Sequence, residues 1–430
     1  MEIIVIDALQ VLDSRGNPTI KVDIVLEDGS KGSFMVPSGA STGIHEAHEL
    51  RDHDESMYHG LGVQKAVDNV VSLREKLYRR GFTQQSFDKT LIDLDGTENK
   101  ELFGANAILG LSCAFARASA KFYNLDLHEY LYRLKHSISF SNKKKQALPN
   151  VTPFSNVING GLHAGNDLQV QEFMIIPLKG DFFYKTRVVS EIYHTLKSLI
   201  QEKYGKESTA VGDEGGFAPA LSKSKEALDL LVEATQKCGY SEQIAFALDA
   251  AASDFYDTKT KKYEIEKGLF LDYKELTDYY NDLLRVYPLI SIEDPMGEDD
   301  FEGFMHFMEN AQIPKEKNLF SQKKKILVVG DDLLVTNPKR ILEAQKEKLC
   351  NSLLLKINQI GTLTESIEAH KLASSSGWHT IVSHRSGETS DDFIADLAYA
   401  LESSIKLGAP ARGERVAKYN RLLEIYSKQK

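Results

Sequence analysis

Residues 351–362 have the sequence NSLLLKINQIGT, which places a lysine inside a run that is otherwise typical of a buried strand. Three leucines precede Lys356, Ile357 follows it, and Gly361 closes the segment before a helical pattern begins. A buried ammonium group must be ion-paired or shift its pKa toward neutrality, because loss of solvent disfavours the charged form. The ordinary explanation is a structural ion pair, so a chemical role for Lys356 needs evidence from the rest of the chain.

The same pattern, a short apolar run followed by helical sequence, repeats through the second part of the chain. The runs are, in order, VQEFMIIP, AVGDEGG, IAFALDAA, PLISIEDP, ILVVGDD, SLLLKINQ and WHTIVSHRSGE. Amphipathic helices are expected between them, for example over 182–203 and 223–238. This alternation predicts an α/β fold with a closed (β/α) barrel rather than an open doubly wound sheet. No GxGxxG sequence follows any of the runs, which argues against a dinucleotide-binding site.

The first part of the chain is organised differently. Residues 3–36 alternate apolar and polar side chains around two turn-rich sequences, DSRGNPT and LEDGS, and predict an antiparallel sheet of about three strands. Helical patterns follow over 61–80 and 104–123. A polar segment rich in serine and lysine then breaks the periodicity and marks a domain boundary. We therefore expect a small α+β domain, a polar linker and a barrel domain, over 1–135, 136–147 and 148–430.

The composition is that of a globular protein with a sizeable core, with 430 residues of which 42% are hydrophobic. A net charge of −10 argues against broad attraction to nucleic acid or to an anionic membrane. Two lysine runs, NKKKQ (142–146) and SQKKKIL (321–327), lack interleaved aromatic residues and are interpreted as solvated loops. The three cysteines have no metal-binding spacing, and neither a signal sequence nor a membrane-spanning run is apparent. These features favour a cytoplasmic protein.

Charged residues gather at the ends of the expected barrel strands, where barrel enzymes have their active sites. In chain order these residues are Glu172, Asp213, Glu214, Asp249, Glu293, Asp294, Asp331, Asp332, Lys356, His384 and Arg385. A single acid in such a position is ordinarily a helix N-cap, but that does not explain several that converge. Asp249, Glu293 and Asp331 would repel one another in one cavity, which predicts a neutralising Mg²⁺ held by oxygen ligands. The sequence HEAHEL at 45–50 lacks the HExxH spacing of a zinc site.

A metal beside Lys356 would give that residue a chemical role. Positive charge and burial would both lower its pKa, so that the neutral amine could remove a weakly acidic proton from a carboxylate substrate. Metal cations stabilise the enediolate that forms. Glu172 and Glu214 could share a proton, and one of them could protonate a leaving hydroxide. The expected reaction is therefore β-elimination of water.

The sequence SHRSGET supplies groups suited to a phosphate dianion. Arg385 offers a planar cation and Ser386 a hydroxyl, while Lys406 could bind a substrate carboxylate. The alternative for Arg385 is a salt bridge at the rim of the barrel. The loop PSGASTG could be a lid that brings Ser38 to a metal or a phosphate, although most sequences of this composition are simply loops.

Seven stretches of the chain resemble the enolase family: DSRGNPT, VPSGASTG, VGDEGG, SIEDP, LLLKINQIGT, SHRSGET and IKLGAPARGER. The resemblance runs nearly from end to end. It implies an α+β cap domain, a modified eight-stranded barrel and a glycolytic enzyme of the cytoplasm. The implied reaction is the reversible dehydration of 2-phospho-D-glycerate to phosphoenolpyruvate through an enediolate stabilised by two Mg²⁺ ions. A lysine base and magnesium are a known pattern of this superfamily.

The resemblance also implies a role for individual residues. Lys356 corresponds to the base and Glu214 to the acid, with Glu172 assisting. The ligands of the first metal would be Asp249, Glu293 and Asp331, and Ser38 would belong to the second. The implied substrate contacts are His163, Gln171, His384, Arg385, Ser386 and Lys406.

The departures from the family concern assembly. A homodimer or a higher homo-oligomer is implied, but Leu9 stands where enolases usually carry an arginine of the dimer interface. Lys21 replaces an expected acid and Glu424 an expected base, so the charges of a second ion pair have exchanged sides.

Two other functions are alternatives. A dehydratase acting on an acid sugar would not need a phosphate pocket, and SHRSGET and the Ser38 loop count against it. Plasminogen binding at the cell surface through terminal lysines is a further function attributed to enolases, and this chain ends in SKQK. The alternative for Lys430 is an ordinary solvated terminus.

Overall fold

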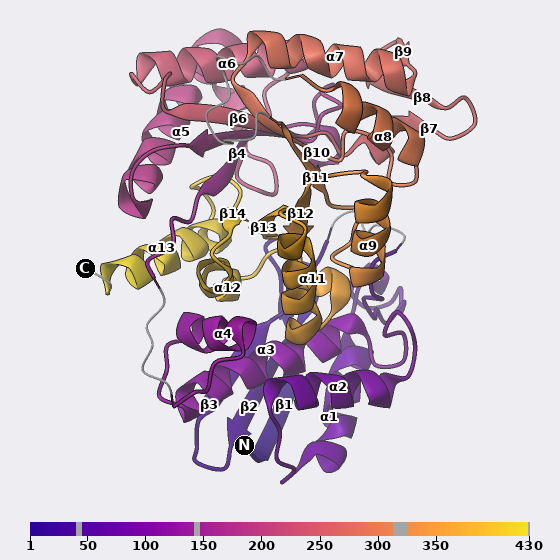
Figure 1. Cartoon of the computed structure of the whole chain (residues 1–430), viewed down its shortest axis with the longest axis vertical. Coiled ribbons are helices and arrows are strands. Elements are labelled where there is room, and N and C mark those ends of the chain that lie inside the picture. Colours follow the sequence, from indigo (N-terminus) through magenta and orange to yellow (C-terminus); the bar gives the residue numbers. More distant parts are fainter. Residues whose placement is uncertain (40–44, 142–146, 313–324, 429–430) are drawn as a thin grey trace.

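The computed structural model describes residues 1–39, 45–141, 147–312 and 325–428, and Figure 1 shows their arrangement. The NKKKQ run, most of the second lysine run and Lys430 therefore lie outside the described residues. The elements up to residue 136 gather at one end of the molecule, and a closed eight-stranded barrel surrounded by helices forms the rest (Figure 1). No helix among the described residues is long and apolar enough to cross a membrane.

The N-terminal domain is built on an antiparallel sheet in the order β1-β2-β3, which confirms the three strands expected over 3–36. The strands are β1 (Ile3–Leu12), β2 (Pro18–Leu26) and β3 (Lys31–Met35). One face of the sheet packs closely on the helix that contains Ala114. The approach leaves no room for a side chain at Gly32, where a Cβ atom would come within 1.9 Å of the carbonyl oxygen of Ala114. Its other face carries exposed apolar residues, among them Val5 and Leu9.

Four α-helices and one short 3-10 helix complete this domain. They are η1 (Tyr58–Gly60), α1 (Gln64–Leu77), α2 (Gln84–Asp95), α3 (Ala105–Phe122) and α4 (Leu127–His136). The patterns over 61–80 and 104–123 correspond to α1 and α3. Almost all of α3 is buried, because it lies between the sheet and the barrel, and a helix buried on every side is apolar all round.

The barrel closes in the order β10-β11-β12-β13-β14-β4-β5-β6. Its strands are β4 (Pro153–Asn159), β5 (Glu172–Pro177), β6 (Ile244–Asp249), β10 (Leu289–Glu293), β11 (Leu327–Gly330), β12 (Ser352–Leu355), β13 (His379–Ser383) and β14 (Ser404–Lys406). The predicted barrel is confirmed. The strand expected at AVGDEGG is wrong, because this glycine-rich stretch is a turn in which the amide of Gly212 donates to the carbonyl of Gly216 at 2.9 Å.

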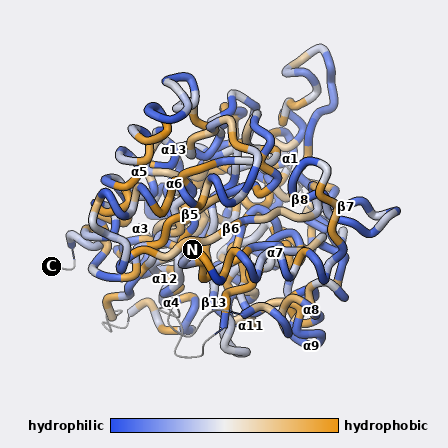
Figure 2. The backbone as a smooth tube through the Cα atoms, turned by 90° about the horizontal axis from the view of Figure 1, so that it is seen from above, coloured by the Kyte–Doolittle hydropathy of each residue, from blue (hydrophilic) through white to orange (hydrophobic). Residues whose placement is uncertain are grey.

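Helices cover the outside of the barrel. They are α5 (Phe182–Tyr204), α6 (Ser224–Lys237), α7 (Tyr273–Val286), α8 (Phe301–Asn310), α9 (Pro338–Glu347), α10 (Ile357–Ile360), α11 (Leu363–Ser375), α12 (Phe393–Leu401) and α13 (Gly413–Ser427), with the 3-10 helices η2 (Gly161–His163), η3 (Lys206–Thr209) and η4 (Ala252–Phe255). A small sheet is formed by β7 (Tyr256–Asp257), β8 (Lys262–Glu266) and β9 (Leu269–Leu271). The turn between β7 and β8 protrudes and is hydrophilic (Figure 2).

One barrel strand runs against its neighbours. β5 pairs antiparallel with both β4 and β6, whereas the other neighbouring strands of the barrel are parallel. Glu172 is consequently the first residue of its strand and lies opposite Asp249, the last residue of β6. The expectation that every site acid follows the carboxyl end of a strand is therefore wrong for Glu172. The reversal nevertheless brings Glu172 to the same end of the barrel as the others.

The interior of the barrel has two different ends. The part away from the charged end is filled by an apolar cluster of Phe154, Met174, Ile176, Ala245, Ala247, Ile290, Val329, Leu354 and Ile381. The end that follows β6, β10 and β14 carries charged side chains instead. The apolar cluster supplies the packed support on which these charged groups stand.

The N-terminal domain is tied to the segment that follows Lys356. The carboxylate of Asp88 in α2 accepts from the amide of Thr364 at 2.9 Å, and the hydroxyl of Ser112 in α3 accepts from the amide of Leu363 at 3.0 Å. These groups cap the start of α11, whose first amides would otherwise have no partner. The cap domain thus helps to fix the position of the loop between β12 and α11.

Candidate active site

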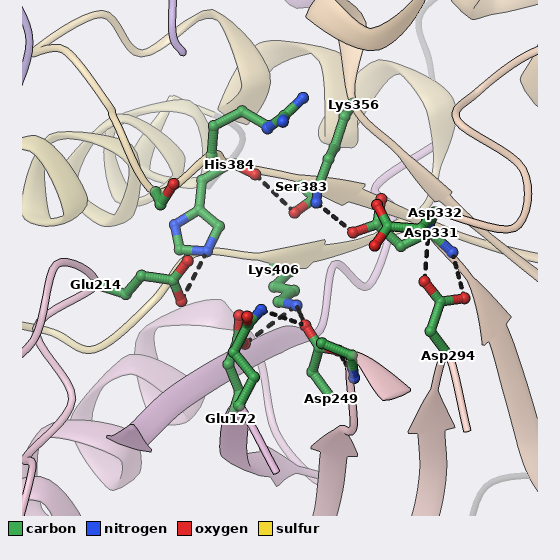
Figure 3. Close-up of a pocket in the computed structure, with 14 residues that line it drawn as sticks. Glu172, Glu214, Asp249, Asp294, Asp331, Asp332, Lys356, Ser383, His384 and Lys406 are labelled. Carbon is green, nitrogen blue, oxygen red and sulfur yellow. Dashed lines mark hydrogen bonds and ion pairs between the residues drawn. The ribbon is translucent and has the colours of Figure 1, made fainter. Parts of the chain in front are cut away.

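A polar cavity opens at the charged end of the barrel (Figure 3). It is lined by Gln171, Glu172, Glu214, Asp249, Ala251, Asp294, Asp331, Asp332, Lys356, Ser383, His384, Arg385, Ser386 and Lys406. Side chains from β5, the second barrel strand in the sequence, and from β14, the last, thus meet at one place. Ten of the thirteen residues expected at the site from the sequence line this cavity: Gln171, Glu172, Glu214, Asp249, Asp331, Lys356, His384, Arg385, Ser386 and Lys406.

A buried lysine lies at the floor of the cavity among three carboxylates. The Nζ of Lys406 is 3.1 Å from Glu172, 3.0 Å from Asp249 and 3.0 Å from Glu293. Burial disfavours the charged ammonium, but these carboxylates outweigh it and raise the pKa of Lys406 well above its ordinary value. Burial, together with the neighbouring acids, raises the pKa of Glu172 and of Glu293. Three carboxylates therefore share one ammonium, and the group carries an excess of negative charge.

Lys356 is ion-paired, which answers the question that its sequence raised. It caps α10 directly after β12, and its Nζ hydrogen-bonds the Oδ2 of Asp331. The other oxygen of Asp331 accepts from the Nε2 of Gln359 at 2.9 Å. Burial would lower the pKa of Lys356, but the carboxylates around it, Asp331 above all and then Glu293, together outweigh burial and the pKa is raised. The lowered pKa expected from the sequence presupposes a metal beside Lys356, so it stays a prediction.

The carboxylate of Asp294 fixes the turn that carries Asp331. The carboxylate of Asp294 accepts from the amides of Asp331 at 3.1 Å and Asp332 at 2.7 Å, as Figure 3 shows. Asp294 has a φ of 37°, which is uncommon for a residue with a side chain and is typical of functional sites. Burial raises the pKa of Asp294, and that of Asp332 to about 8. Among the described residues, these three acids are the one group whose ligand atoms all lie within 4.8 Å of one another.

Glu214 lies on the other side of the cavity from Lys356 (Figure 3). Its Oε2 accepts from the Nδ2 of Asn156 at 3.0 Å and lies 3.4 Å from the Nε2 of His384. Burial and the negative charge of Glu214 both raise the pKa of Glu172. This arrangement is consistent with two carboxyl groups that share a proton.

Arg385 is held by the N-terminal domain. Its guanidinium makes a two-pronged ion pair with Glu46, at 2.9 and 3.1 Å, and donates to the Oδ1 of Asn358 at 3.1 Å. Both members of the ion pair are buried. The salt bridge considered as the alternative for Arg385 therefore exists, while Arg385 also lines the cavity beside Ser386.

The sequence matches two family models, and the residues that line the cavity lie within the matched ranges. Residues 3–131 match the model described as "Enolase, N-terminal domain", and residues 145–429 match "Enolase, C-terminal TIM barrel domain". An enolase of Methanocaldococcus jannaschii is 50% identical over 422 residues, which cover 97% of this chain and 93% of that relative. The chain belongs to the enolase family. It is therefore a hydro-lyase of the phosphopyruvate hydratase class, and the acid-sugar alternative is not supported.

Three expected site residues of this enolase are not brought to the cavity wall. Glu293 stands behind Lys406 and reaches the site through that ion pair. Ser38 is buried elsewhere, where its hydroxyl donates to Asp13 at 2.9 Å and its amide donates to the carbonyl of Gly387 at 2.7 Å. The side chain of His163 lies outside the described part of the structure.

Several residues at the site were given no role from the sequence. Asp294 and Asp332 were recognised only as acids beside better candidates. Glu46 and Asn156 were missed because neither belongs to a charged strand end, and Arg415 was missed because it lies in α13. The stretch IKLGAPARGER contains Arg415, so its family resemblance is the one signal in the sequence that pointed there.

The oxygen ligands at this site fit a hard divalent cation. Asp249, Glu293 and Asp331 offer only carboxylate oxygens, and two of them belong to the group with excess negative charge around Lys406. The buried Oε1 of Gln171 has no hydrogen-bond partner among the described residues and is another oxygen donor at the cavity. Such a donor set suits Mg²⁺ better than zinc, which favours nitrogen and sulfur ligands.

Proposed function

We propose that this enolase catalyses the reversible dehydration of 2-phospho-D-glycerate to phosphoenolpyruvate in glycolysis. The observation that carries the proposal is the placement of Lys356 and Glu214 on different sides of one cavity, with Lys406 and its carboxylates between them (Figure 3). A base on one side and an acid on the other can remove a proton and a hydroxide from neighbouring carbon atoms of one substrate.

Lys356 is proposed to remove the proton from the carbon that carries the phosphate. The ion pair with Asp331 favours the protonated lysine, so the base form requires that the charge of Asp331 be engaged elsewhere. Asp249, Glu293 and Asp331 would hold Mg²⁺, which supplies positive charge to stabilise the developing carboxylate dianion of the substrate. The family resemblance implies two ions, with Ser38 assigned to the second.

Glu214 is proposed to protonate the leaving hydroxide, with Glu172 assisting. Burial and the charge of Glu214 raise the pKa of Glu172, which favours a proton held within this pair. Asn156 and His384 hold the Glu214 carboxyl group in place. The acid is therefore oriented before the substrate arrives.

The remaining site residues are proposed to bind the substrate. Lys406 would meet the substrate carboxylate, while Arg385, Ser386 and His163 would bind the phosphate. Arg385 is already fixed by Glu46, so little conformational freedom is lost on binding. Gln171 and His384 complete the set of expected contacts.

The direct test follows the formation of phosphoenolpyruvate from 2-phosphoglycerate by ultraviolet absorbance, with and without magnesium. We expect turnover that depends on the metal and disappears with a chelator. An acid sugar offered in place of 2-phosphoglycerate is the control and should not react. Inactivity of the folded protein toward 2-phosphoglycerate would contradict the proposal.

We further infer a homodimer or a higher homo-oligomer. The outer face of the N-terminal sheet exposes Val5 and Leu9, and apolar groups at the surface of a sheet are suited to an interface between copies. Plasminogen binding gains no support, because Lys428 pairs with Asp126 at 3.2 Å within the chain.

A further inference from the structure

A fully buried arginine on the last helix holds together the two loops that carry the candidate acid and the phosphate-binding groups. The Nη1 of Arg415 donates to the Nδ1 of His384 at 2.6 Å and to the carbonyl of Arg385 at 2.6 Å. Its Nη2 donates to the carbonyls of Asp213 at 3.0 Å and Ser386 at 2.6 Å. A single guanidinium thus links the loop after β13 to the loop that contains Glu214.

The contact with His384 decides where the imidazole carries its proton. A guanidinium only donates hydrogen bonds, so the Nδ1 of His384 must accept and cannot bear a hydrogen. Burial lowers the pKa of His384 to about 4, so its ring is neutral near pH 7 and has one N–H group. That N–H is therefore at Nε2, the ring nitrogen that lies 3.4 Å from the Oε2 of Glu214 (Figure 3).

The carboxyl group of Glu214 is ordered as a consequence. Its Oε2 accepts a hydrogen bond from the Nδ2 of Asn156 at 3.0 Å and faces the Nε2–H of His384 at 3.4 Å, an electrostatic contact rather than an aligned hydrogen bond. An oxygen that accepts from one N–H group and faces a second is a poor place for the proton of a neutral acid, so this proton is directed to Oε1. The oxygen from which this acid donates its proton is thereby selected.

Close packing holds these groups at their distances. Gly408 has a φ of 74°, and a side chain there would come within 2.6 Å of the Glu214 carbonyl and 3.0 Å of the His384 ring. The hydroxyl of Tyr419, one turn after Arg415 in α13, donates to the Gly408 carbonyl at 2.9 Å. The amide of Ala409 donates to the carbonyl of Glu214 at 2.9 Å. The ring and the acid therefore have little room to rearrange.

We propose that Arg415 is a positioning residue for dehydration, which fixes His384 as the Nε2–H tautomer and so orients the acid Glu214. The role of Glu214 rests on the proposed function, whereas the tautomer of His384 does not. Lys356 lies on the other side of the cavity from Glu214, and its ammonium bonds Asp331, whereas the guanidinium of Arg415 bonds His384 and the carbonyls of Arg385, Asp213 and Ser386. Loss of Arg415 should therefore impair the acid more than the base.

The first experiment measures the tautomer. The full chain is labelled with ¹⁵N-histidine, and the two nitrogen shifts of His384 are identified by their loss in His384→Asn. We expect a protonated Nε2 and an unprotonated Nδ1 at pH 7 in the unsubstituted protein, in the absence of substrate. A protonated Nδ1 would overturn the proposal whether or not any variant folds.

The second experiment separates the two half-reactions in Arg415→Met. We expect a loss of the Nε2–H signature, a fall in dehydration of at least about tenfold and exchange of the substrate's α-proton with solvent within about threefold of the unsubstituted rate. Arg415→Lys keeps a donor and should recover part of both the signature and the dehydration rate. Equal losses of exchange and dehydration, with the tautomer unchanged, would overturn the proposal.

A matched control lies on the same helix. Arg421 makes an ion pair with Asp396 at 2.7 Å and does not contact His384, so Arg421→Gln should leave the tautomer and the ratio of the two rates unchanged. If Arg421→Gln changes the tautomer as Arg415→Met does, the effect is a general disturbance of α13 and the proposal is wrong. Failure of the unsubstituted chain to dehydrate 2-phosphoglycerate would contradict the proposed function and leave the tautomer result intact.

Discussion

Two buried lysines near the charged end of the barrel have very different surroundings. Lys418 of α13 pairs with one carboxylate, that of Glu388, at 2.6 Å, and both side chains are almost fully buried. Glu388 also accepts from the amides of Arg385 and Thr389, at 3.1 Å each. Lys406, in contrast, faces three carboxylates.

The difference separates a structural ion pair from a candidate functional one. At Lys418 the carboxylate has its counter-charge and its hydrogen bonds are satisfied, so Lys418, helped by the positive charge of Arg415, lowers the pKa of Glu388 despite its burial. At Lys406 the pKa values of Glu172 and Glu293 are raised, because one ammonium cannot compensate three carboxylates. Burial of charge therefore does not by itself mark a site. An imbalance of buried charge is the more informative feature.

The largest expected effect concerns the proposed base, Lys356, and the proposed acid, Glu214, which line the same cavity as Lys406. Lys356→Ala should abolish both turnover and exchange of the substrate's α-proton, by about 10³-fold or more, because the base is lost. Glu214→Gln should block dehydration but retain some exchange, because the base remains. Deuterium exchange followed by NMR measures the one reaction, and absorbance measures the other. Exchange in Lys356→Ala, or normal dehydration in Glu214→Gln, would show that the roles are wrongly assigned.

The balanced pair should respond in stability instead. Glu388→Gln leaves Lys418 buried without a counter-charge and should lower the free energy of unfolding by about 3–5 kcal/mol at pH 7. The pKa of Glu388 is below its ordinary 4.5, so its stabilisation is present above about pH 4.5 and is lost as the pH falls through the folded pKa. Urea unfolding at several pH values checks this prediction.

The control for that experiment is an exposed pair on the same helix. Glu424 lies 3.5 Å from Arg421 and its side chain is 66% exposed, so Glu424→Gln should change stability by no more than about 0.5 kcal/mol.

The group around Lys406 should respond in the opposite sense. Glu293→Gln removes one of its three carboxylates and should raise the stability of the magnesium-free enzyme while it abolishes activity. A destabilised Glu293→Gln would mean that the charges around Lys406 are balanced after all.

A smaller effect is expected when one proposed metal ligand is altered. Asp331→Asn should raise the magnesium concentration needed for half-maximal activity, by about tenfold or more, without unfolding the barrel. Titration of activity against magnesium, with circular dichroism as the folding control, provides the measurement. An unchanged titration curve would show that Asp331 serves only its ion pair with Lys356 and the neighbouring hydrogen bond.

How far the sequence predicts this structure depends on how local each signal is. The strands β6 and β10 to β13 were evident because parallel barrel strands are apolar on both faces. Two strands were absent from the predicted set. β14 has only three residues, and β4 carries buried Ser155 and Asn156, whose partners Tyr419 and Glu214 are distant in the chain. The reversed direction of β5 also leaves no local mark in the sequence.

The site was predicted where a residue's chemistry follows from its place on a strand. Asp249, Asp331 and Lys356 stand at strand ends, and their convergence follows from the barrel itself. Glu46 lies in the N-terminal domain and pairs with Arg385 of the barrel, and Arg415 lies on the last helix and contacts His384. Their roles therefore need the tertiary structure. The ion pair of Lys356 with Asp331 could not be predicted for the same reason, because the distance between the two residues cannot be obtained from sequence.

The smallest expected effect concerns Lys21 and Glu424, two solvent-accessible charges at the proposed dimer interface. Lys21 pairs with Asp23 of its own strand at 3.1 Å, and Glu424 lies on α13, so each has a neighbour within the chain. If they also meet across the dimer, their exchange relative to the family keeps the attraction, and an exposed pair of this kind contributes about 0–1 kcal/mol. Lys21→Glu should raise the dimer dissociation constant severalfold, because it places like charges together, and the added Glu424→Lys should restore it. Sedimentation velocity of both single variants and the double variant measures the coupling. Additive effects without rescue would show that the two charges do not meet, and that Lys21 is held only by Asp23.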